Sequence, residues 1–338
     1  MPVPCSSSTR VIALMNQKGG VGKTTTTVNL AAGIAELGKR VLVVDLDPQS
    51  HASLHLGVDP ATFPPRSEIR ARSIYDLLAD PTLDATPALR VINPNLSVLA
   101  AETDLAALET ELSDIEPAQR TTRLGAVLDK LNGKVGGFDY VLIDCPPSLG
   151  VLTLNGLAAA REVLIPMQAH FLALQGVSKL LETVQLVGRT VNPHLRVAGV
   201  VLCMHDPASS HVKEVVQDMV SFFERANVSD VTVPWKGAKV YQPPVRRNIK
   251  LAECPSFGQT IFQYAPFCPG ALDYKALAAA IAAEWMPASS PSAPAAAAVA
   301  TPASAPIAAE PKPAPAVTTR RPPRSAQSAG KSAAETGA

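Results

Sequence analysis

Six runs of apolar residues recur between residues 11 and 204, and most of them are continuous rather than alternating with polar residues. They occupy residues 11–15, 40–45, 96–101, 138–144, 162–167 and 196–204. Continuous apolar runs of this length are typical of strands that are covered on both faces, as in mostly parallel sheets. Helical patterns lie between or after them, at residues 24–37, 119–131, 174–187, 211–225 and 271–285. The sequence therefore predicts an α/β fold, a doubly wound and mostly parallel sheet with helices on both faces.

The apolar periodicity stops near residue 286, and this sets the expected domain organisation. Hydrophobic residues make up 47% of the 338-residue chain, which is enough for a large core. Beyond residue 286 alanine, proline and serine dominate, a composition that cannot bury enough apolar surface to become ordered. We expect a short flexible N-terminus at 1–10, one folded domain at 11–286 and a disordered Ala/Pro-rich tail at 287–338.

Charge, cysteines and hydropathy exclude several classes of protein. The formal net charge of +1 gives no overall field that would attract nucleic acid or a membrane, so any such binding needs a local patch. Five scattered cysteines without a Cys-x-x-Cys pair favour a reducing compartment and no structural zinc. Residues 1–10 lack the apolar core of a secretory signal, and no apolar run approaches the roughly 20 residues of a spanning helix. We expect a soluble cytoplasmic protein.

A glycine-rich segment follows the first predicted strand, where ligands bind in such sheets. It reads Asn-Gln-Lys-Gly-Gly-Val-Gly-Lys-Thr-Thr over residues 16–25. The usual phosphate-loop pattern would place a glycine at Gln17, so the segment is a variant of that loop. Its glycines let backbone N–H groups and the following helix N-terminus face phosphates. Lys23 supplies positive charge to the β- and γ-phosphates, and the Thr24 hydroxyl is a ligand for Mg²⁺. The expected ATP-binding residues of the loop are Lys18, Gly19, Gly20, Val21, Gly22, Lys23, Thr24 and Thr25.

Carboxylates follow two further predicted strands. Asp45-Leu46-Asp47-Pro48-Gln49 comes after the 40–45 run, and Asp144-Cys145-Pro146-Pro147-Ser148 ends the 138–144 run. A carboxylate at the carboxyl end of a strand can accept a hydrogen bond from an attacking water near the γ-phosphate. The alternative for Asp45 and Asp47 is an ordinary strand-ending turn completed by Pro48.

Together these three motifs resemble the deviant Walker A ATPases of the ParA/MinD family. The run 18–25 is similar to their phosphate loop, and the two carboxylate motifs resemble their first switch and their Walker B motif with the second switch. The resemblance implies that Lys18 reaches across a nucleotide-sandwiched homodimer to the partner's ATP. It also implies that Asp47 positions the attacking water, while Asp45 and Asp144 support Mg²⁺ from its second coordination shell.

Further segments resemble the short chromosome-partitioning ParA proteins of the Soj type. They are Leu251-Ala252-Glu253-Cys254-Pro255-Ser256-Phe257-Gly258, Pro166-Met167-Gln168 and Leu174-Gln175-Gly176. In Val245-Arg246-Arg247-Asn248, arginine stands where the family usually has proline. The resemblance implies that Asn248 contacts the adenine base.

Basic residues cluster around this same region and predict a surface for nonspecific DNA. Lys236, Lys239, Arg246, Arg247 and Lys250 fall within about fifteen residues, interleaved with Trp235 and Tyr241. The alternative is a solvated charged face. Ala208 stands where an arginine is common in the family, which would weaken the DNA surface unless the basic strip compensates.

The resemblance implies a DNA-partitioning ATPase of chromosome or plasmid that is cytoplasmic and nucleoid-associated. ATP and Mg²⁺ would drive its dimerisation on nonspecific DNA, and a ParB-like partner would stimulate hydrolysis and release. A MinD-like positioning ATPase is the first alternative, although it requires a basic amphipathic terminal helix that the Pro-rich tail does not provide. A metabolic ATP-dependent ligase or a cluster-carrying reductase is the second, and the cargo stays open.

Overall fold

The computed structural model describes residues 9–170, 173–229 and 231–285, and these residues contain one sheet of eight strands. The strands lie in the order β3-β4-β2-β5-β1-β6-β7-β8, and all neighbouring pairs are parallel except β3 with β4. Their bounds are β1 Arg10–Leu14, β2 Val41–Asp45, β3 Leu89–Asn93, β4 Leu96–Leu99, β5 Tyr140–Asp144, β6 Glu162–Met167, β7 Arg196–Leu202 and β8 Lys239–Val240. The predicted doubly wound, mostly parallel α/β fold is confirmed.

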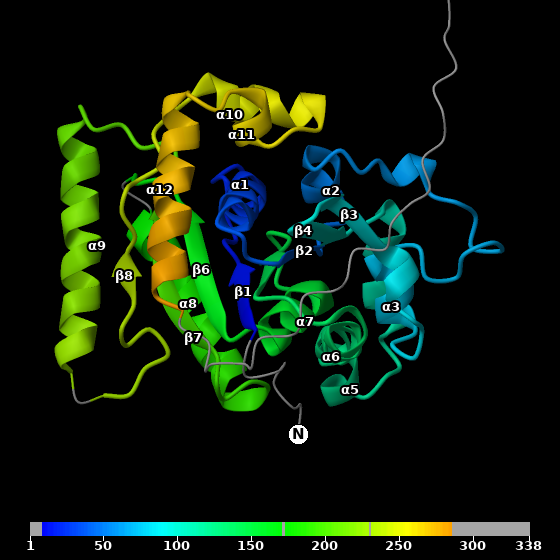
Figure 1. Cartoon of the computed structure of the whole chain (residues 1–338). Coiled ribbons are helices and arrows are strands. Elements are labelled where there is room, and N and C mark those ends of the chain that lie inside the picture. The colour runs from blue at the N-terminus through cyan, green and yellow to red at the C-terminus, as the bar shows by residue number, and fades with distance from the viewer. Residues whose placement is uncertain (1–8, 171–172, 230, 286–338) are drawn as a thin grey trace, which may run out of the picture. The chain divides into compact units, whose positions relative to one another are not determined.

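Helices cover both faces of this sheet (Figure 1). The longer ones are α1 Lys23–Glu36, α6 Arg123–Val135, α7 Val151–Ala159, α8 Ala173–Thr190, α9 Ser210–Val228 and α12 Pro269–Ala283. The shorter ones are α2 His51–His55, α3 Ile74–Ala79, α4 Leu108–Glu111, α5 Pro117–Thr121, α10 Ile249–Glu253 and α11 Ile261–Tyr264. Turns of 3₁₀-helix occur at Pro60–Thr62, Thr86–Ala88, Thr103–Ala107 and Cys254–Phe257.

Each strand contributes side chains to two separate cores, which explains why its apolar run is continuous. In β1, Val11 and Ala13 join the core formed with α3, α6, α7, α8 and α9. Ile12 and Leu14 point the other way, into the core formed with α1 and α12. Helices α1 and α12 pack side by side over that second face (Figure 1), and their approach is close enough that a Cβ on Gly33 would lie 2.8 Å from Ala278 Cβ.

The six predicted strands are all present, with ends that shift by a few residues. The predicted single helix over 119–131 is wrong, because α5 ends before Thr122 and α6 begins after it. The hydroxyls of Thr121 and Thr122 donate to the carbonyls of Pro117 and Ala118, a local bonding pattern that competes with a continuous helix. No described helix is long and apolar enough to cross a membrane. The expected tail at 287–338 and most of the expected N-terminal segment lie outside the described residues.

The topology brings three functional segments to one edge of the sheet. Strand β5 lies between β1 and β2, so the carboxyl ends of all three strands are adjacent. Asp144 is in register with Leu14 of β1 on one side and with Asp45 of β2 on the other. The glycine-rich loop and both carboxylate motifs therefore start from neighbouring points, where a doubly wound sheet binds its ligand.

Candidate nucleotide-binding site

The glycine-rich loop joins β1 to α1 and has the backbone conformation of a phosphate cradle. Gly20 and Gly22 have φ angles of 72° and 94°, in the left-handed region that glycine adopts without strain. Gly22 is also the N-cap of α1, and a Cβ there would lie 3.3 Å from Cys203. The N-terminus of a 14-residue helix thus opens directly onto the loop. Backbone N–H groups and the positive end of a helix attract anions, so this arrangement suits the predicted phosphate loop.

Lys23 is the lysine that belongs to this cradle. Its side chain is 8% exposed, and its Nζ donates to the backbone carbonyl of Lys18 at 3.4 Å, across the loop. Burial lowers the pKa of Lys23, whereas the negative charges of Asp144 and Asp47 act in the opposite direction. The predicted lysine and the two predicted carboxylates therefore lie in one electrostatic neighbourhood.

Asp45 and Asp144 form a buried pair of carboxylates beside the first turn of α1. Thr24 Oγ1 donates to Asp144 Oδ2 at 2.7 Å, and Thr27 Oγ1 donates to Asp144 Oδ1 at 2.9 Å. Asp45 accepts from the backbone and hydroxyl of Ser53 at 2.9 and 2.7 Å. Burial raises the pKa of Asp45 to about 7, with the charge of Asp144 as the next cause, and burial raises that of Asp144 to about 6.

These oxygen atoms fit the chemistry of a magnesium site. A hydroxyl and a carboxylate at 2.7 Å from each other, at the edge of a phosphate cradle, are hard donors of the type that Mg²⁺ prefers. A divalent cation would also favour the ionised forms of Asp45 and Asp144, which burial alone disfavours.

Asp47 lies just beyond this pair in a tight turn. Its backbone N–H donates to Asp45 Oδ1 at 3.1 Å, and its own Oδ1 accepts from the Gln49 backbone at 3.0 Å. Ser50 closes the turn with a left-handed φ of 55°, unusual for a residue other than glycine. The carboxylate is partly exposed, and its charge acts on Lys23.

Lys18 does not point into the cradle of its own subunit. Its side chain is exposed, and its Nζ lies 2.6 Å from Nε2 of His170, a residue that follows β6. The backbone of Lys18 is held separately, because its N–H donates to Asn16 Oδ1 at 3.0 Å.

A cavity of about 450 Å³ adjoins the loop at Gly22 and Thr25, and we call it the base pocket after the predicted adenine contact. Its walls include Cys203, Met204, Arg246, Arg247, Asn248, Leu251 and Tyr274. Asn248 is the N-cap of α10, with Oδ1 accepting from the Lys250 backbone at 2.9 Å. The residue predicted to contact adenine thus lines a cavity that adjoins the phosphate loop.

Arg246, which replaces the usual proline, is bound to Asp273 of α12. Its backbone N–H donates to Asp273 Oδ2 at 2.9 Å, and its guanidinium donates to both carboxylate oxygens at 2.7–3.1 Å. Asp273 is 5% exposed and raises the pKa of Arg246 further. The substitution therefore ties the 245–248 segment to α12.

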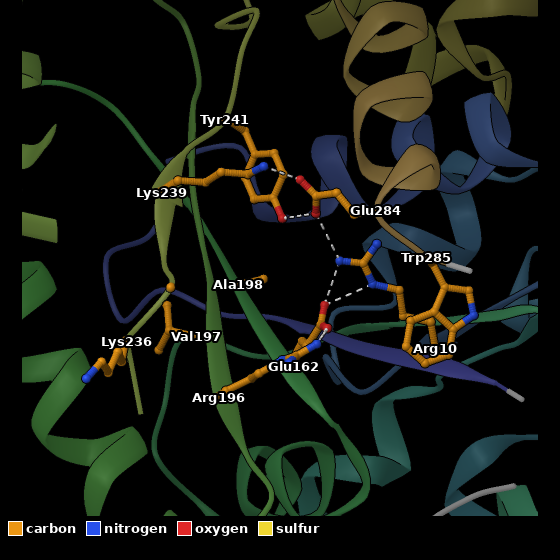
Figure 2. Close-up of a pocket in the computed structure, with 11 residues that line it drawn as sticks. Arg10, Glu162, Arg196, Val197, Ala198, Lys236, Lys239, Tyr241, Glu284 and Trp285 are labelled. Atoms are coloured by element: carbon orange, nitrogen blue, oxygen red, sulfur yellow. Dashed lines mark hydrogen bonds and ion pairs between the residues drawn. The ribbon is translucent and has the colours of Figure 1, made fainter. Parts of the chain in front are cut away.

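The predicted basic strip is divided between two ends of the sheet. Arg246 and Arg247 line the base pocket, whereas Lys236 and Lys239 line a separate cavity of about 260 Å³. That cavity lies at the amino ends of β1, β6 and β7 and is crossed by ion pairs among Arg10, Glu162, Arg196, Lys239 and Glu284 (Figure 2). Lys236 points away from these pairs and donates to the Ser229 carbonyl at 2.9 Å.

Several cations of the strip are already neutralised within the chain. Lys239 pairs with Glu284, Lys250 pairs with Glu253 at 2.8 Å, and Arg246 pairs with Asp273. Arg247 is exposed and has no ion pair among the described residues. Arg247 and Lys236, whose side chain bonds the Ser229 carbonyl, are the two members of the strip without an ion pair among the described residues.

Sequence reasoning missed the partners that hold the site together. Thr27 had a usable signal, because it lies three residues after Thr24 and shares its helix face. Ser53, His170 and Asp273 gave no signal, because each meets its partner only through the tertiary fold.

With this geometry established, comparisons with known proteins identify the family. A family model described as AAA domain matches residues 9–197. The chromosome partitioning protein ParA of Caulobacter vibrioides is 40% identical over 271 residues, covering 80% of this chain and 92% of that protein. The chromosome-partitioning ATPase Soj of Thermus thermophilus is 42% identical over 271 residues, covering 80% of this chain and 94% of that protein.

A solved structure is similar over the same region. Cobyrinic acid a,c-diamide synthase from Mycobacterium smegmatis, crystallised with an ATP analogue and magnesium, is 35% identical with a TM-score of 0.65. The match covers 82% of this chain and 95% of that one. The chain therefore belongs to the AAA domain family of P-loop proteins and, within it, to the ParA and Soj chromosome-partitioning ATPases.

Proposed function

We propose that this protein is a DNA-partitioning ATPase that uses Mg²⁺ and ATP to form a homodimer on nonspecific DNA and that hydrolysis releases it. The observation that carries the proposal is the contrast between two lysines of one loop. Lys23 is buried inside the phosphate cradle, whereas Lys18 is exposed and directed outside it. A second lysine in this position is useful when the phosphates that it contacts belong to another subunit.

Within one subunit, the loop 18–25 binds the phosphates through backbone N–H groups and Lys23. Thr24 would hold Mg²⁺ directly, and Asp144 and Asp45 would orient its coordinated waters, while the bound ion offsets phosphate charge. Asp47 accepts a hydrogen bond from the attacking water. Its partly exposed carboxylate beside Lys23 is suited to this role. Asn248 contacts the base in the adjoining cavity.

DNA binding follows from dimerisation in this proposal. The strip of Lys236, Lys239, Arg246, Arg247 and Lys250 offers few free charges in a single subunit, because three of the five are paired internally. A dimer doubles the contacts on one particle and makes the second engagement intramolecular, which converts weak contacts into useful affinity. A ParB-like partner that stimulates hydrolysis, and a cytoplasmic, nucleoid-associated location, belong to the same proposal and are supported by the similarity to ParA and Soj.

The alternatives have less support from the structure. A MinD-like membrane regulator needs a free amphipathic helix, whereas α12, the last helix among the described residues, buries Tyr274, Leu277 and Ile281 in the core. A cluster-carrying reductase needs accessible thiolates, whereas Cys145 is 1% exposed and burial raises the pKa of its thiol.

The test is the Asp47→Ala protein, compared with its parent for dimerisation, DNA binding and phosphate release. If Asp47 positions the water, the variant binds Mg²⁺ and ATP, dimerises and stays on DNA, and its turnover falls by roughly 10²-fold or more. Light scattering and DNA electrophoresis in the presence of ATP measure the first two properties. A parent protein that hydrolyses ATP but never binds DNA would instead favour the ligase alternative.

A further inference from the structure

The phosphate loop is attached to the end of β6 and the residues just after it, 166–170. Three contacts join them: Asn16 Nδ2 donates to the Pro166 carbonyl at 2.9 Å, Gln168 Nε2 donates to the Gly20 carbonyl at 3.3 Å, and Lys18 Nζ meets His170 Nε2 at 2.6 Å. The first two contacts bind the backbone carbonyls of Pro166 and Gly20 and do not involve a lysine side chain. The third engages the side chain that distinguishes this loop from an ordinary phosphate loop.

The Lys18 contact requires a neutral imidazole. A lysine ammonium can only donate, so His170 Nε2 must accept and the ring must carry its proton on Nδ1. Lys18 is the charged group that faces this imidazole among the described residues, and its charge adds to burial in lowering the pKa of His170. At pH 7.5 the ring is therefore neutral and holds Lys18.

We propose that His170 is a positioning residue that retains Lys18 in its own subunit and so opposes ATP-driven dimerisation. This inference rests on the proposed function, in which Lys18 contacts the partner's ATP. Lys18 cannot keep the imidazole and reach another subunit's phosphates at the same time, so each dimer exchanges two such contacts. Breaking this contact costs free energy, so it weakens ATP-driven dimerisation unless the partner's phosphates bind Lys18 more strongly.

Removing the imidazole should remove this cost and tighten ATP-dependent dimerisation. A partly exposed hydrogen bond of this kind shifts an equilibrium by roughly threefold, so losing two per dimer should tighten ATP-dependent dimerisation by about tenfold. Protonation of His170 would have the same effect, because an imidazolium cannot accept and repels the ammonium. The restraint should therefore be present above the pKa of His170 and disappear as the pH falls through it.

The experiment compares the dimer dissociation constant of four full-length proteins in saturating Mg²⁺ and ATP by sedimentation or light scattering. His170→Ala should dimerise about tenfold more tightly than the parent at pH 7.5, and the ratio should fall as the pH is lowered through the pKa of His170. His170→Gln keeps an uncharged acceptor at a similar place, so it should resemble the parent at pH 7.5 and retain its restraint at pH 5.5. His194→Ala removes an exposed histidine after α8, at the opposite edge of the sheet, and should match the parent at both values.

A second measurement tests the contact without nucleotide or dimer. The pKa of His170, followed by NMR in the nucleotide-free protein, should rise in Lys18→Ala, because the neighbouring positive charge is gone. An unchanged pKa would show that the contact is absent and would overturn the inference. Equal dimerisation of His170→Ala and its parent would overturn it too. If the parent protein does not dimerise with ATP, the proposed function is wrong, and the proposed restraint by His170 is wrong with it, whatever the NMR result.

Discussion

Two lysines five residues apart in the phosphate loop have different environments. Lys23 is enclosed by the loop and lies near Asp144 and Asp47, whereas Lys18 contacts His170 outside the cradle. Their side chains are chemically identical. The fold encloses Lys23 within the loop of its own subunit and leaves Lys18 outside it, which is the difference that the proposed function requires.

Substituting the two lysines should therefore have separate effects. Lys23→Ala should weaken ATP binding at least 100-fold, because the enclosed charge of the cradle is lost. Lys18→Ala should keep most of the ATP affinity of the monomer and lose ATP-driven dimerisation and turnover. Equilibrium binding of a fluorescent ATP analogue and light scattering separate these outcomes, with Lys179→Ala on the exposed face of α8 as the control. A normal ATP dimer formed by Lys18→Ala would contradict the assignment.

The buried carboxylate pair makes stability depend on pH. The pKa values of about 7 for Asp45 and about 6 for Asp144 lie above those of an unfolded chain, near 4. The folded protein therefore binds more protons than the unfolded one between about pH 4 and 7, and the free energy of unfolding attributable to this pair falls as pH rises through that range.

Asp144→Asn should remove much of this effect. The amide can keep both threonine contacts, because its oxygen accepts from one hydroxyl and its nitrogen donates to the other, which rotates to accept. We expect the nucleotide-free variant to melt about 2–5 °C above the parent at pH 7.5, with a flatter dependence of Tm on pH. Mg²⁺ with ATP should stabilise the parent more than the variant. Identical pH dependence of the two melting curves would show that the pair is not coupled.

At the scale of secondary-structure elements, one glycine allows the edge strand to form. A Cβ on Gly199 of β7 would lie 2.1 Å from the Lys239 carbonyl of β8. Strand β8 is only two residues long, yet it leads into the 241–248 segment that lines the base pocket. The close approach of these two backbones thus supports the wall of the nucleotide site.

Gly199→Ala should separate β8 from β7. Overpacking of this kind costs about 2–3 kcal/mol, so Tm should fall by roughly 5–10 °C, and ATP affinity should fall as the base pocket loosens. Gly176→Ala is the matched control, because nothing lies within 4 Å of a Cβ at that helical position, and it should leave Tm unchanged or slightly raised. Thermal melting with and without ATP measures both effects, and equal Tm values for the two variants would refute the proposed role of Gly199.

The sequence predicted the elements whose own residues show a clear apolar pattern. Strands β1, β2, β5 and β6 are buried along their whole length, so their apolar runs are continuous. Strand β3 was missed because it is an exposed antiparallel edge with a mixed pattern, and β8 because two residues form no period. The phosphate loop was predictable because its residues are consecutive. Its attachment to His170 depends on the meeting of β1 and β6 and could not be predicted.

At the scale of the whole molecule, a net charge of +1 makes DNA binding depend on local contacts. We expect Arg247→Ala to weaken ATP-dependent DNA binding for all sequences alike, because this arginine is unpaired among the described residues. Loss of one contact per subunit should reduce the slope of log affinity against log salt by about 2 for a dimer. Lys239→Ala, whose cation already pairs with Glu284, should have a smaller effect in the same titration. The reverse order of the two variants would move the DNA surface to the opposite edge of the sheet.

The central place of β1 has a consequence for how the chain is made. Strand β1 is synthesised first, yet its two neighbours begin only at Tyr140 and Glu162. The phosphate loop that follows β1 can therefore take its final shape only after more than half of the domain has left the ribosome. A chain that stalls before β6 would contain the complete glycine-rich loop without both strands that flank β1. We therefore expect ATP affinity only in chains that extend beyond β6.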